Sequence, residues 1–233
     1  MTTSFQIKHW KNSETVWRRA LDIDPQNPIA RNNLGMFFLE KGAFQEAERE
    51  FRQSIARGPW QLRPHINLGD TLLQLKDFTG AEAAYRHGLS VHPRDALLRQ
   101  GLGLALLELG GSQAAAKQLS IALTADQNLA YAHYGLSRVA MSRQTGEARR
   151  LAARACQLSR YRDLRLLAHY ARTIALNGDI DLAYKVGLAA LRQFEGMKKS
   201  DSGKEIVEVL DLCRSQRTNR PVPFIRDGSG INN

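Results

Sequence analysis

The chain of 233 residues is long enough for one or two compact domains or for one elongated repeat array. Hydrophobic residues make up 43% of it, which argues against wholesale disorder, and the formal net charge of +10 favours acidic partners without identifying one. The start lacks the apolar core of a secretion signal, and no apolar run reaches the roughly 18 residues that a membrane helix needs, so no direct membrane span is expected.

The first expected helix covers residues 13–24, "SETVWRRALDID", and ends before Pro25. Proline ends a helix because it lacks an amide donor and clashes with the preceding turn. No partner helix of the same pattern precedes this one. We therefore interpret residues 1–27 as a truncated unit that keeps only its second helix.

Several columns of residues recur along the chain with a period close to 34. Small residues in one column let two helices approach closely, alanines stand where the second helix of a pair crosses the first, and large residues fill the gap to the next unit. The columns are Gly35, Gly69 and Gly103; Ala47, Ala81, Ala115, Ala148 and Ala183; Phe51, Tyr85 and Leu119; and Pro25, Pro59 and Pro93. Glycine-marked turns, "KGAF" at 41–44 and "LGGS" at 109–112, separate the helices within a pair.

These columns resemble the tetratricopeptide repeat family, with the closest match in "ARNNLGMFFLEKGAFQEAEREFRQSI". The resemblance implies an all-α, right-handed α-solenoid of helix-turn-helix repeats. In the fourth and fifth repeats the pattern weakens, because Ser137 and Ala171 replace the glycine and the prolines disappear. The expected repeats are 28–61, 62–95, 96–129, 130–163 and 164–197, followed by a capping helix at 198–216 and a flexible tail at 217–233.

The sequence contains no recognisable motif for catalysis, cofactor binding or metal binding. The G-x-G at Gly101–Gly103 follows no strand, and Gly103 already belongs to the helix-packing column. The six histidines form no pair with metal-ligand spacing, and we interpret them as surface or edge residues. No serine or cysteine has a base placed by a recognisable motif. We therefore expect a protein that is not an enzyme and that holds no cofactor.

The family resemblance implies that the first helices of the repeats line a concave groove, which is the usual peptide site. An extended segment or an amphipathic helix would both suit its mixed polar and apolar lining. The groove residues expected on this basis are Asn32, Asn33, Met36 and Leu39 from the first repeat, Arg63, Ile66, Asn67, Asp70 and Leu73 from the second, Gln100 and Leu104 from the third, Tyr131, Tyr134 and Arg138 from the fourth, and Arg165 and Arg172 from the fifth.

Two asparagines, Asn33 and Asn67, stand at the same groove position in neighbouring repeats. An amide offers both a donor and an acceptor. The two asparagines therefore either form a two-rung ladder that holds a peptide backbone or order the helices of the groove.

Some family members clamp an acidic chaperone C-terminus with a lysine and an asparagine at positions where this chain has Ile66 and Asp70. We do not expect a clamp of that kind.

The fourth and fifth repeats are basic: nine arginines and two acids lie between Arg138 and Arg172, a local charge of 9 − 2 = +7. Arg149, Arg150 and Arg154 form the expected basic patch, which either binds an acidic partner, phosphate or anionic lipid or is a solvated surface. We expect no nucleic-acid partner, because aromatic residues are not interleaved with the arginines.

The first 35 residues also resemble the junction before the repeats in bacterial membrane glycosyltransferases, through Trp10, Asn12, Ser13, Thr15 and Trp17. That resemblance implies a soluble accessory part of a membrane enzyme or of a polysaccharide-assembly system, facing the periplasm. The leading hypothesis is a non-catalytic scaffold that binds a protein or peptide, in the cytoplasm or, in the second case, the periplasm. Membrane-associated complexes remain among the possible partners, and the partner's identity and the oligomeric state stay open.

Overall fold

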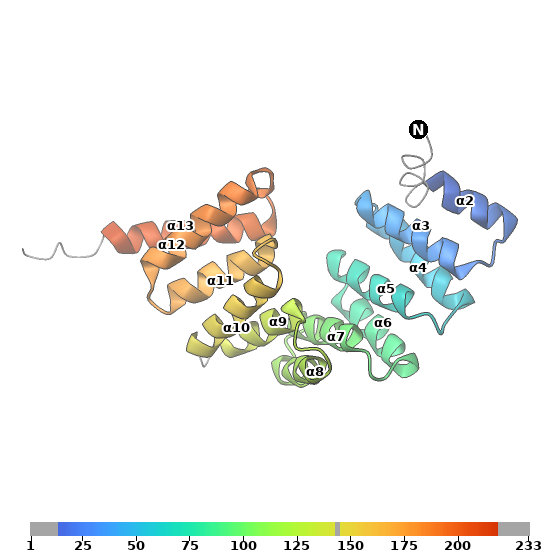
Figure 1. Cartoon of the computed structure of the whole chain (residues 1–233), viewed down its shortest axis with the longest axis horizontal. Helices are drawn as coiled ribbons and strands as arrows, with labels where there is room; N and C mark the ends of the chain where they lie inside the picture. Colours follow the sequence, from blue (N-terminus) through green and yellow to red (C-terminus); the bar gives the residue numbers. More distant parts are fainter. Residues whose placement is uncertain (1–13, 143–144, 219–233) are drawn as a thin grey trace, which may run out of the picture. The chain divides into compact units, whose positions relative to one another are not determined.

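The computed structural model describes residues 14–142 and 145–218 of the chain. Within these ranges all regular structure is helical, and consecutive helices form packed pairs (Figure 1). The expected all-α fold of paired helices is therefore confirmed. Most of the expected tail at 217–233 and the first 13 residues of the truncated unit lie outside the described residues.

Two compact units divide the chain after Ser142. This division falls inside the expected fourth repeat at 130–163, so the two helices of that repeat belong to different units. Unit 1 contains α2 (Glu14–Ile23), α3 (Pro28–Glu40), α4 (Phe44–Arg57), α5 (Leu62–Gln74), α6 (Phe78–Val91), α7 (Ala96–Glu108), α8 (Ser112–Ala125) and α9 (Ala130–Ala140). Unit 2 contains α10 (Thr145–Leu158), α11 (Leu164–Leu176), α12 (Ile180–Gln193), the 3-10 helix η1 (Glu195–Met197) and α13 (Asp201–Thr218).

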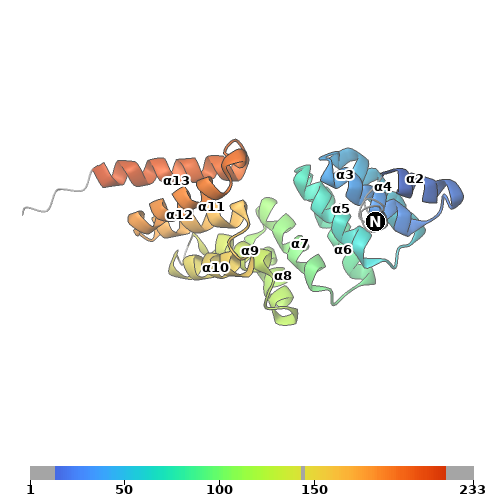
Figure 2. The same cartoon turned by 45° about the horizontal axis from the view of Figure 1, so that its top comes forward.

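In unit 1, helices α3, α5, α7 and α9 pack side by side in chain order, and we call them the A helices. Figure 2 shows α3, α5 and α7 succeeding one another along this unit. Each of the first three packs against its own second helix, α4, α6 or α8. A Cβ added at Gly35 would lie 2.6 Å from the Phe51 ring, and one added at Gly69 would lie 2.4 Å from the Tyr85 ring. The glycine column is thus the space into which the buried large residues of the second helices fit.

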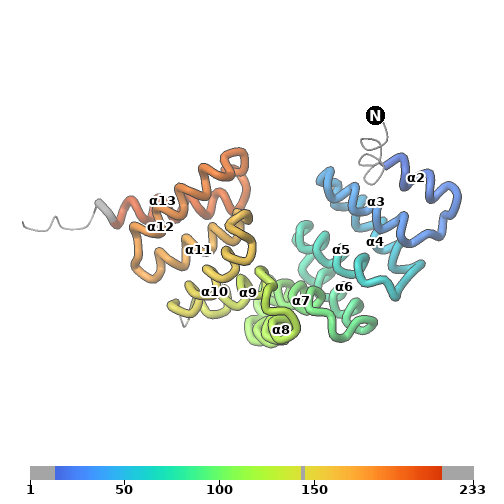
Figure 3. The backbone as a smooth tube through the Cα atoms, viewed as in Figure 1, coloured from blue at the N-terminus to red at the C-terminus, as the bar shows by residue number. Residues whose placement is uncertain are grey.

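Each of the four described turns within a helix pair contains one residue in the left-handed backbone region. Gly42 has φ 72°, Gly110 has φ 82° and, in unit 2, Gly178 has φ 82°. The second repeat places Lys76 at the same point with φ 60°. The short turns are visible in the tube of Figure 3. A residue with a Cβ is strained in this region, so the second repeat carries a local cost that the three glycine turns avoid.

A side chain at the fourth position of each repeat in unit 1 donates a hydrogen bond to the carbonyl oxygen six residues earlier. The four bonds are Arg31 Nη2 to Pro25 O, 3.0 Å; His65 Nε2 to Pro59 O, 2.8 Å; Arg99 Nη2 to Pro93 O, 2.6 Å; and His133 Nε2 to Gln127 O, 3.0 Å. Because a carbonyl oxygen can only accept, both histidines carry their proton on Nε2 in this arrangement. These position-4 hydrogen bonds attach each A helix to the loop that precedes it.

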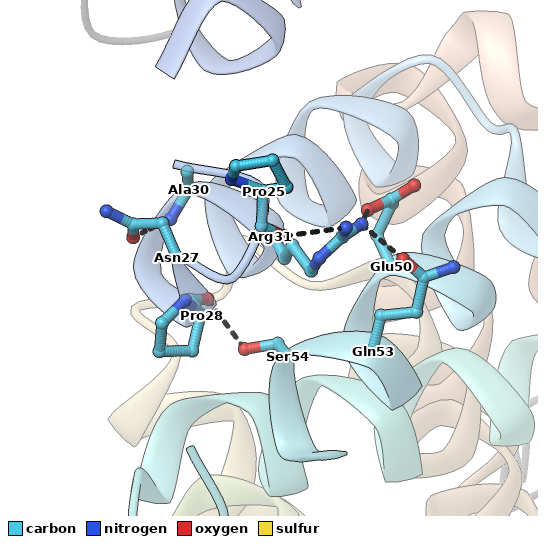
Figure 4. A network of polar contacts seen from close by, with 8 residues as sticks. All are labelled: Pro25, Asn27, Pro28, Ala30, Arg31, Glu50, Gln53 and Ser54. Carbon is cyan, nitrogen blue, oxygen red and sulfur yellow. Dashed lines mark hydrogen bonds and ion pairs between the residues drawn. The ribbon is translucent and has the colours of Figure 1, made fainter. Parts of the chain in front are cut away.

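Figure 4 shows the first of these bonds in its surroundings. The Arg31 guanidinium lies between the Pro25 carbonyl and the α4 side chains of Glu50 and Gln53, and it forms an ion pair of 3.1 Å with Glu50. The Asn27 side chain accepts from the Ala30 amide at 2.9 Å and so caps α3, while the Ser54 hydroxyl donates to the Pro28 carbonyl at 2.7 Å. One arginine therefore joins a loop, an A helix and its second helix.

His65 is fully buried, and its ring lies 5.0 Å from that of His87 and 6.3 Å from that of His92. His169, in unit 2, is also buried. The expectation that the histidines are surface or edge residues is therefore wrong for these two. Burial lowers the pKa of His65, the Pro59 hydrogen bond opposes this shift, and the charges of His87 and His92 add to it. Its Nδ1 is buried without a hydrogen-bond partner among the described residues, so a second proton would have no acceptor.

In unit 2, α11 packs against α10, α12 and α13. Helix α13 covers the stack with Ile206, Val209, Leu210 and Cys213, all buried. Its remaining apolar residues, Val207 and Leu212, are exposed, so the outer face of α13 is partly apolar.

The left-handed turn residue generates a paired prediction. Lys76→Gly is expected to stabilise the protein by about 0.5–1 kcal/mol, because relief of the left-handed strain outweighs the extra freedom of glycine in the unfolded chain. The reverse exchange at the equivalent turn, Gly42→Lys, is expected to destabilise it by a similar amount. Urea denaturation of both variants measures the two changes, and a destabilising Lys76→Gly would contradict the assignment of strain to this turn.

The buried histidine predicts a pH dependence of stability. The folded pKa of His65 lies below its ordinary value of about 6.5, so its contribution is present above that pH and is lost as the pH falls through the folded pKa. The non-titrating His65→Gln should remove this loss, and wild type should therefore destabilise more steeply below about pH 6.5. Thermal melts across pH 5–8 test this, and His133→Gln controls for exchanging the same type of hydrogen bond. Superimposable wild-type and His65→Gln profiles would refute it.

Candidate functional site

The four A helices of unit 1 present a mixed surface, which we call the A-face. It consists of the expected groove residues of this unit that keep exposed surface. Met36 is 37% exposed, Arg63 and Asp70 are also exposed, and the others are half-buried. Half-buried are Asn32, Asn33, Leu39, Asn67, Leu73, Gln100, Leu104, Tyr131, Tyr134 and Arg138. Ile66 differs from them, because only 7% of it is exposed and it packs in the hydrophobic core of the unit.

The asparagines link neighbouring A helices. Asn67 Nδ2 donates to Asn32 Oδ1 at 2.9 Å, which joins α5 to α3. The side chain of Asn33, the other member of the expected ladder, forms no hydrogen bond with any residue in the described ranges. The Asn67 amide is thus at least partly occupied by the fold itself, as expected if the asparagines order the A helices.

Asp70 and Tyr85 form a pair that the sequence did not reveal. Tyr85 belongs to α6, is fully buried, and its hydroxyl donates to Asp70 Oδ1 at 2.6 Å. A Cβ added at Gly69 or at Gly101 would lie 2.4 Å or 2.3 Å from the Tyr85 ring, so these two glycines leave the space that the ring occupies. Tyr85 was expected as a packing residue of its column. The feature of the sequence that could have indicated this pair is the Tyr85 hydroxyl, which Phe51 and Leu119 of the same column lack.

The surroundings change the acidity of both members of this pair. Although Asp70 keeps exposed surface, the loss of surrounding water raises its pKa, and the hydrogen bond from Tyr85 acts in the opposite direction. Burial raises the pKa of Tyr85, and the neighbouring Asp70 raises it further, so this hydroxyl stays protonated and remains a donor. Gln100 adds another acceptor, because its Oε1 is buried without a hydrogen-bond partner in the described part of the chain.

An aromatic and charged cluster lies on α9. The rings of Tyr131 and Tyr134 meet edge to face with centroids 5.9 Å apart, and the Arg138 guanidinium lies 5.7 Å from the Tyr134 centroid. Arg138 also forms an ion pair with Glu108 of α7. Burial alone would lower the Arg138 pKa, but the hydrogen bond with Glu108 and the contacts with Tyr134 outweigh it, so the pKa is raised. The Arg138 charge is therefore already partnered.

The basic residues of unit 2 differ in their availability. Arg149 forms an ion pair of 3.3 Å with Asp179, so it is not a free member of the expected basic patch. Arg172 lies 3.4 Å from Glu205 of α13, beside a pocket of about 200 Å³ that Leu176 and Leu212 also line. Arg150, Arg154 and Arg165 are exposed. The anion-binding alternative thus rests on exposed arginines of α10 and α11.

The described residues hold no group of three or more histidine, cysteine or acidic side chains that could bind a metal ion. Nor is any helix of residues 14–142 and 145–218 both long and apolar enough to cross a membrane. Both cysteines are reduced and buried, and burial raises the pKa of Cys156 to about 12. Such a thiol is a poor nucleophile, because the thiolate is the reactive form.

Comparison with known proteins identifies repeats in the first half of the chain. Two family models described as "Tetratricopeptide repeat" match residues 38–100 and 8–60. Among curated proteins, the chain is similar to protein O-mannosyl-transferase Tmtc3 of Drosophila melanogaster, with 27% identity over 85 residues. That match covers 36% of this chain and 9% of the transferase, so the chain spans only about a tenth of that relative.

Solved structures with a similar fold cover most of the chain. The crystal structure of the APC/C hetero-tetramer Cut9–Hcn1 matches with 15% identity and a TM-score of 0.78, over 90% of this chain and 41% of that one. Yeast Tom70 matches with 16% identity and a TM-score of 0.67, over 90% and 44%. PilF of Pseudomonas aeruginosa matches with 21% identity and a TM-score of 0.66, over 88% and 91%. At these identities the likeness concerns the fold alone.

The buried cysteines predict an unreactive native protein. At pH 8, Ellman's reagent is expected to label neither thiol of the folded chain within minutes, because both are buried and the Cys156 thiol stays protonated. The same reaction in denaturant should label both cysteines. Rapid labelling of the native protein would contradict the burial of these residues and reopen the question of a nucleophilic site.

Proposed function

The chain is a tetratricopeptide repeat protein, and from this premise we propose that it is a non-catalytic scaffold that binds a segment of a partner protein on the A-face of unit 1. Folds of this family serve in general as scaffolds for protein–protein interaction. The observation that carries the proposal is the set of A-face groups that the fold does not use. The Met36 side chain is exposed, the Asn33 side-chain amide has no hydrogen-bond partner among the described residues, and Asp70 uses Oδ1 but not Oδ2 within the described chain.

The A-face is suited to binding because its backbone is already fixed. The position-4 hydrogen bonds tie each A helix to its loop, and Asn67 ties α5 to α3. A preorganised surface loses little conformational entropy when a ligand binds. Exposed Met36 offers flexible apolar contact, and Asp70 offers hydrogen-bond acceptors, which together suit an extended segment or one face of a helix.

Catalysis is not part of this proposal. The tetratricopeptide repeat fold is typically non-catalytic, and the transferase among the relatives matches only through a small part of its length. The perturbed Asp70 lies beside a tyrosine whose hydroxyl stays protonated, without a nucleophile or a second carboxylate bonded to it among the described residues.

A second candidate function is that of an accessory region of a glycosyltransferase. The similarity to protein O-mannosyl-transferase Tmtc3 favours it, together with the segment from Trp10 to Trp17. In that case the repeats would bind a partner or substrate protein for an enzyme carried elsewhere. Sequencing the gene on both sides of this region discriminates the two candidates: adjacent membrane helices with a transferase domain support the second, and their absence leaves the first.

Site-specific photocrosslinking tests the binding surface. A photoreactive amino acid at Met36 is expected to capture partner protein in native lysate, because this side chain lies exposed on the A-face. The same amino acid at Ala83, exposed on α6 outside the A-face, is the matched control and should capture several-fold less. Capture from Ala83 without capture from Met36 would place the partner elsewhere and overturn the proposal.

A further inference from the structure

Asp70 occupies the ninth position of its repeat, and the equivalent residues on the other A helices are Met36, Leu104 and Arg138. Two of these are apolar, and the Arg138 charge is partnered by Glu108. The row therefore presents one carboxylate between two apolar side chains. The A helices that carry it pack side by side, α3 against α5 and α5 against α7.

The carboxylate of Asp70 is held in place by Tyr85 of the second helix, α6. The Tyr85 hydroxyl fixes Oδ1 at 2.6 Å, and the buried Tyr85 ring is itself fixed between Gly69 and Gly101. The other oxygen, Oδ2, has no hydrogen-bond partner within residues 14–142 and 145–218. A carboxylate is an acceptor only, so Oδ2 can accept a hydrogen bond from solvent or from a bound segment.

The Asp70 carboxylate is not neutralised by an ion pair within the described part of the chain. No lysine or arginine in the described ranges forms an ion pair with Asp70. Loss of water around the carboxylate raises its pKa, so its ionised form is disfavoured in the unbound protein and a cation would stabilise it. On α7, the buried Gln100 Oε1 also lacks a donor among the described residues.

We propose that the A-face selects partner segments with a lysine or arginine side chain, whose charged group donates hydrogen bonds to Asp70. Met36 and Leu104, on the two neighbouring A helices, contact apolar residues of the segment on either side of that cation. Packed helices are about 8–10 Å apart and an extended chain advances about 3.3 Å per residue, so apolar residues should stand roughly three positions before and after the cation. This inference rests on the proposed function, because it assigns the chemistry of a segment bound on the A-face.

The experiment uses the full chain and a random-peptide phage library. Wild type is expected to enrich peptides in lysine or arginine with apolar residues about three positions away, whereas Asp70→Asn loses this enrichment. A selected peptide is then synthesised with lysine and with norleucine, which has a similar length but no charge. The lysine form should bind wild type roughly tenfold more tightly, and the difference should vanish in Asp70→Asn.

Three further variants separate charge recognition from general binding and from folding. Tyr85→Phe, which reproduces the Phe51 of the preceding repeat, should reduce the lysine preference because the carboxylate loses its fixed orientation. Met36→Ala should weaken both peptides equally, since it removes apolar contact. Glu82→Gln exchanges an acid for its amide on α6, outside the A-face, and should change neither affinity.

The melting temperature distinguishes a binding role of Asp70 from a purely structural one. An acid with a raised folded pKa costs stability once the pH exceeds that pKa, so Asp70→Asn should melt at neutral pH no lower than wild type while losing the lysine preference. A marked fall in melting temperature would make Asp70 a structural residue and overturn the inference.

The two proposals fail in different ways. Peptides that bind wild type and depend on Met36, yet show no cation enrichment or keep it in Asp70→Asn, overturn the charge selection and leave the scaffold proposal standing. Failure of the library to yield any peptide that depends on Met36 counts against binding on the A-face itself, and the charge selection falls with it.

Discussion

The position-4 hydrogen bonds are the interaction on which the rest of unit 1 depends. The peptide chain must leave each second helix at a loop, and an unpaired loop carbonyl beside a packed helix would be costly. Arg31, His65, Arg99 and His133 each give that carbonyl a donor from the next A helix. In the first three repeats the proline column and the fourth position therefore act together: proline ends one helix, and its carbonyl accepts the hydrogen bond that orients the next. In the fifth repeat the fourth position is Leu167, which has no side-chain donor.

The sequence predicted the parts of this fold that recur and missed those that depend on a single contact. The helix pairs and the glycine column follow from the period, because every repeat must solve the same packing problem. The burial of Ile66 and His65 was not predicted. Periodicity assigns a residue to a helix face, whereas the burial of these two depends on how neighbouring helices pack. Arg149 was expected as part of a basic patch. Its ion pair with Asp179 could not be predicted, because the two residues are 30 apart and follow no repeated pattern.

The A-face combines a geometry that repeats along the chain with local chemical differences. Its helices are held by similar contacts from repeat to repeat, yet the ninth position changes from methionine to aspartate, leucine and arginine. Asp70 could be predicted as a groove residue from its position, but its hydrogen bond to Tyr85 could not, because a tyrosine in a packing column normally serves as a large apolar group. The fold thus sets where A-face side chains lie, and the residues that differ between repeats determine which groups those side chains present.

The contact between Tyr85 and Gly101 crosses from one repeat into the next. Because of this contact, the second and third repeats fit each other and cannot be exchanged freely with other repeats. A repeat that carries an asparagine at its sixth position, as the first two do with Asn33 and Asn67, has no room for the Tyr85 ring if it is moved to follow the second repeat. The order of these repeats is therefore constrained by side-chain volume, and shuffling, duplication or grafting of this array must keep a glycine after the tyrosine.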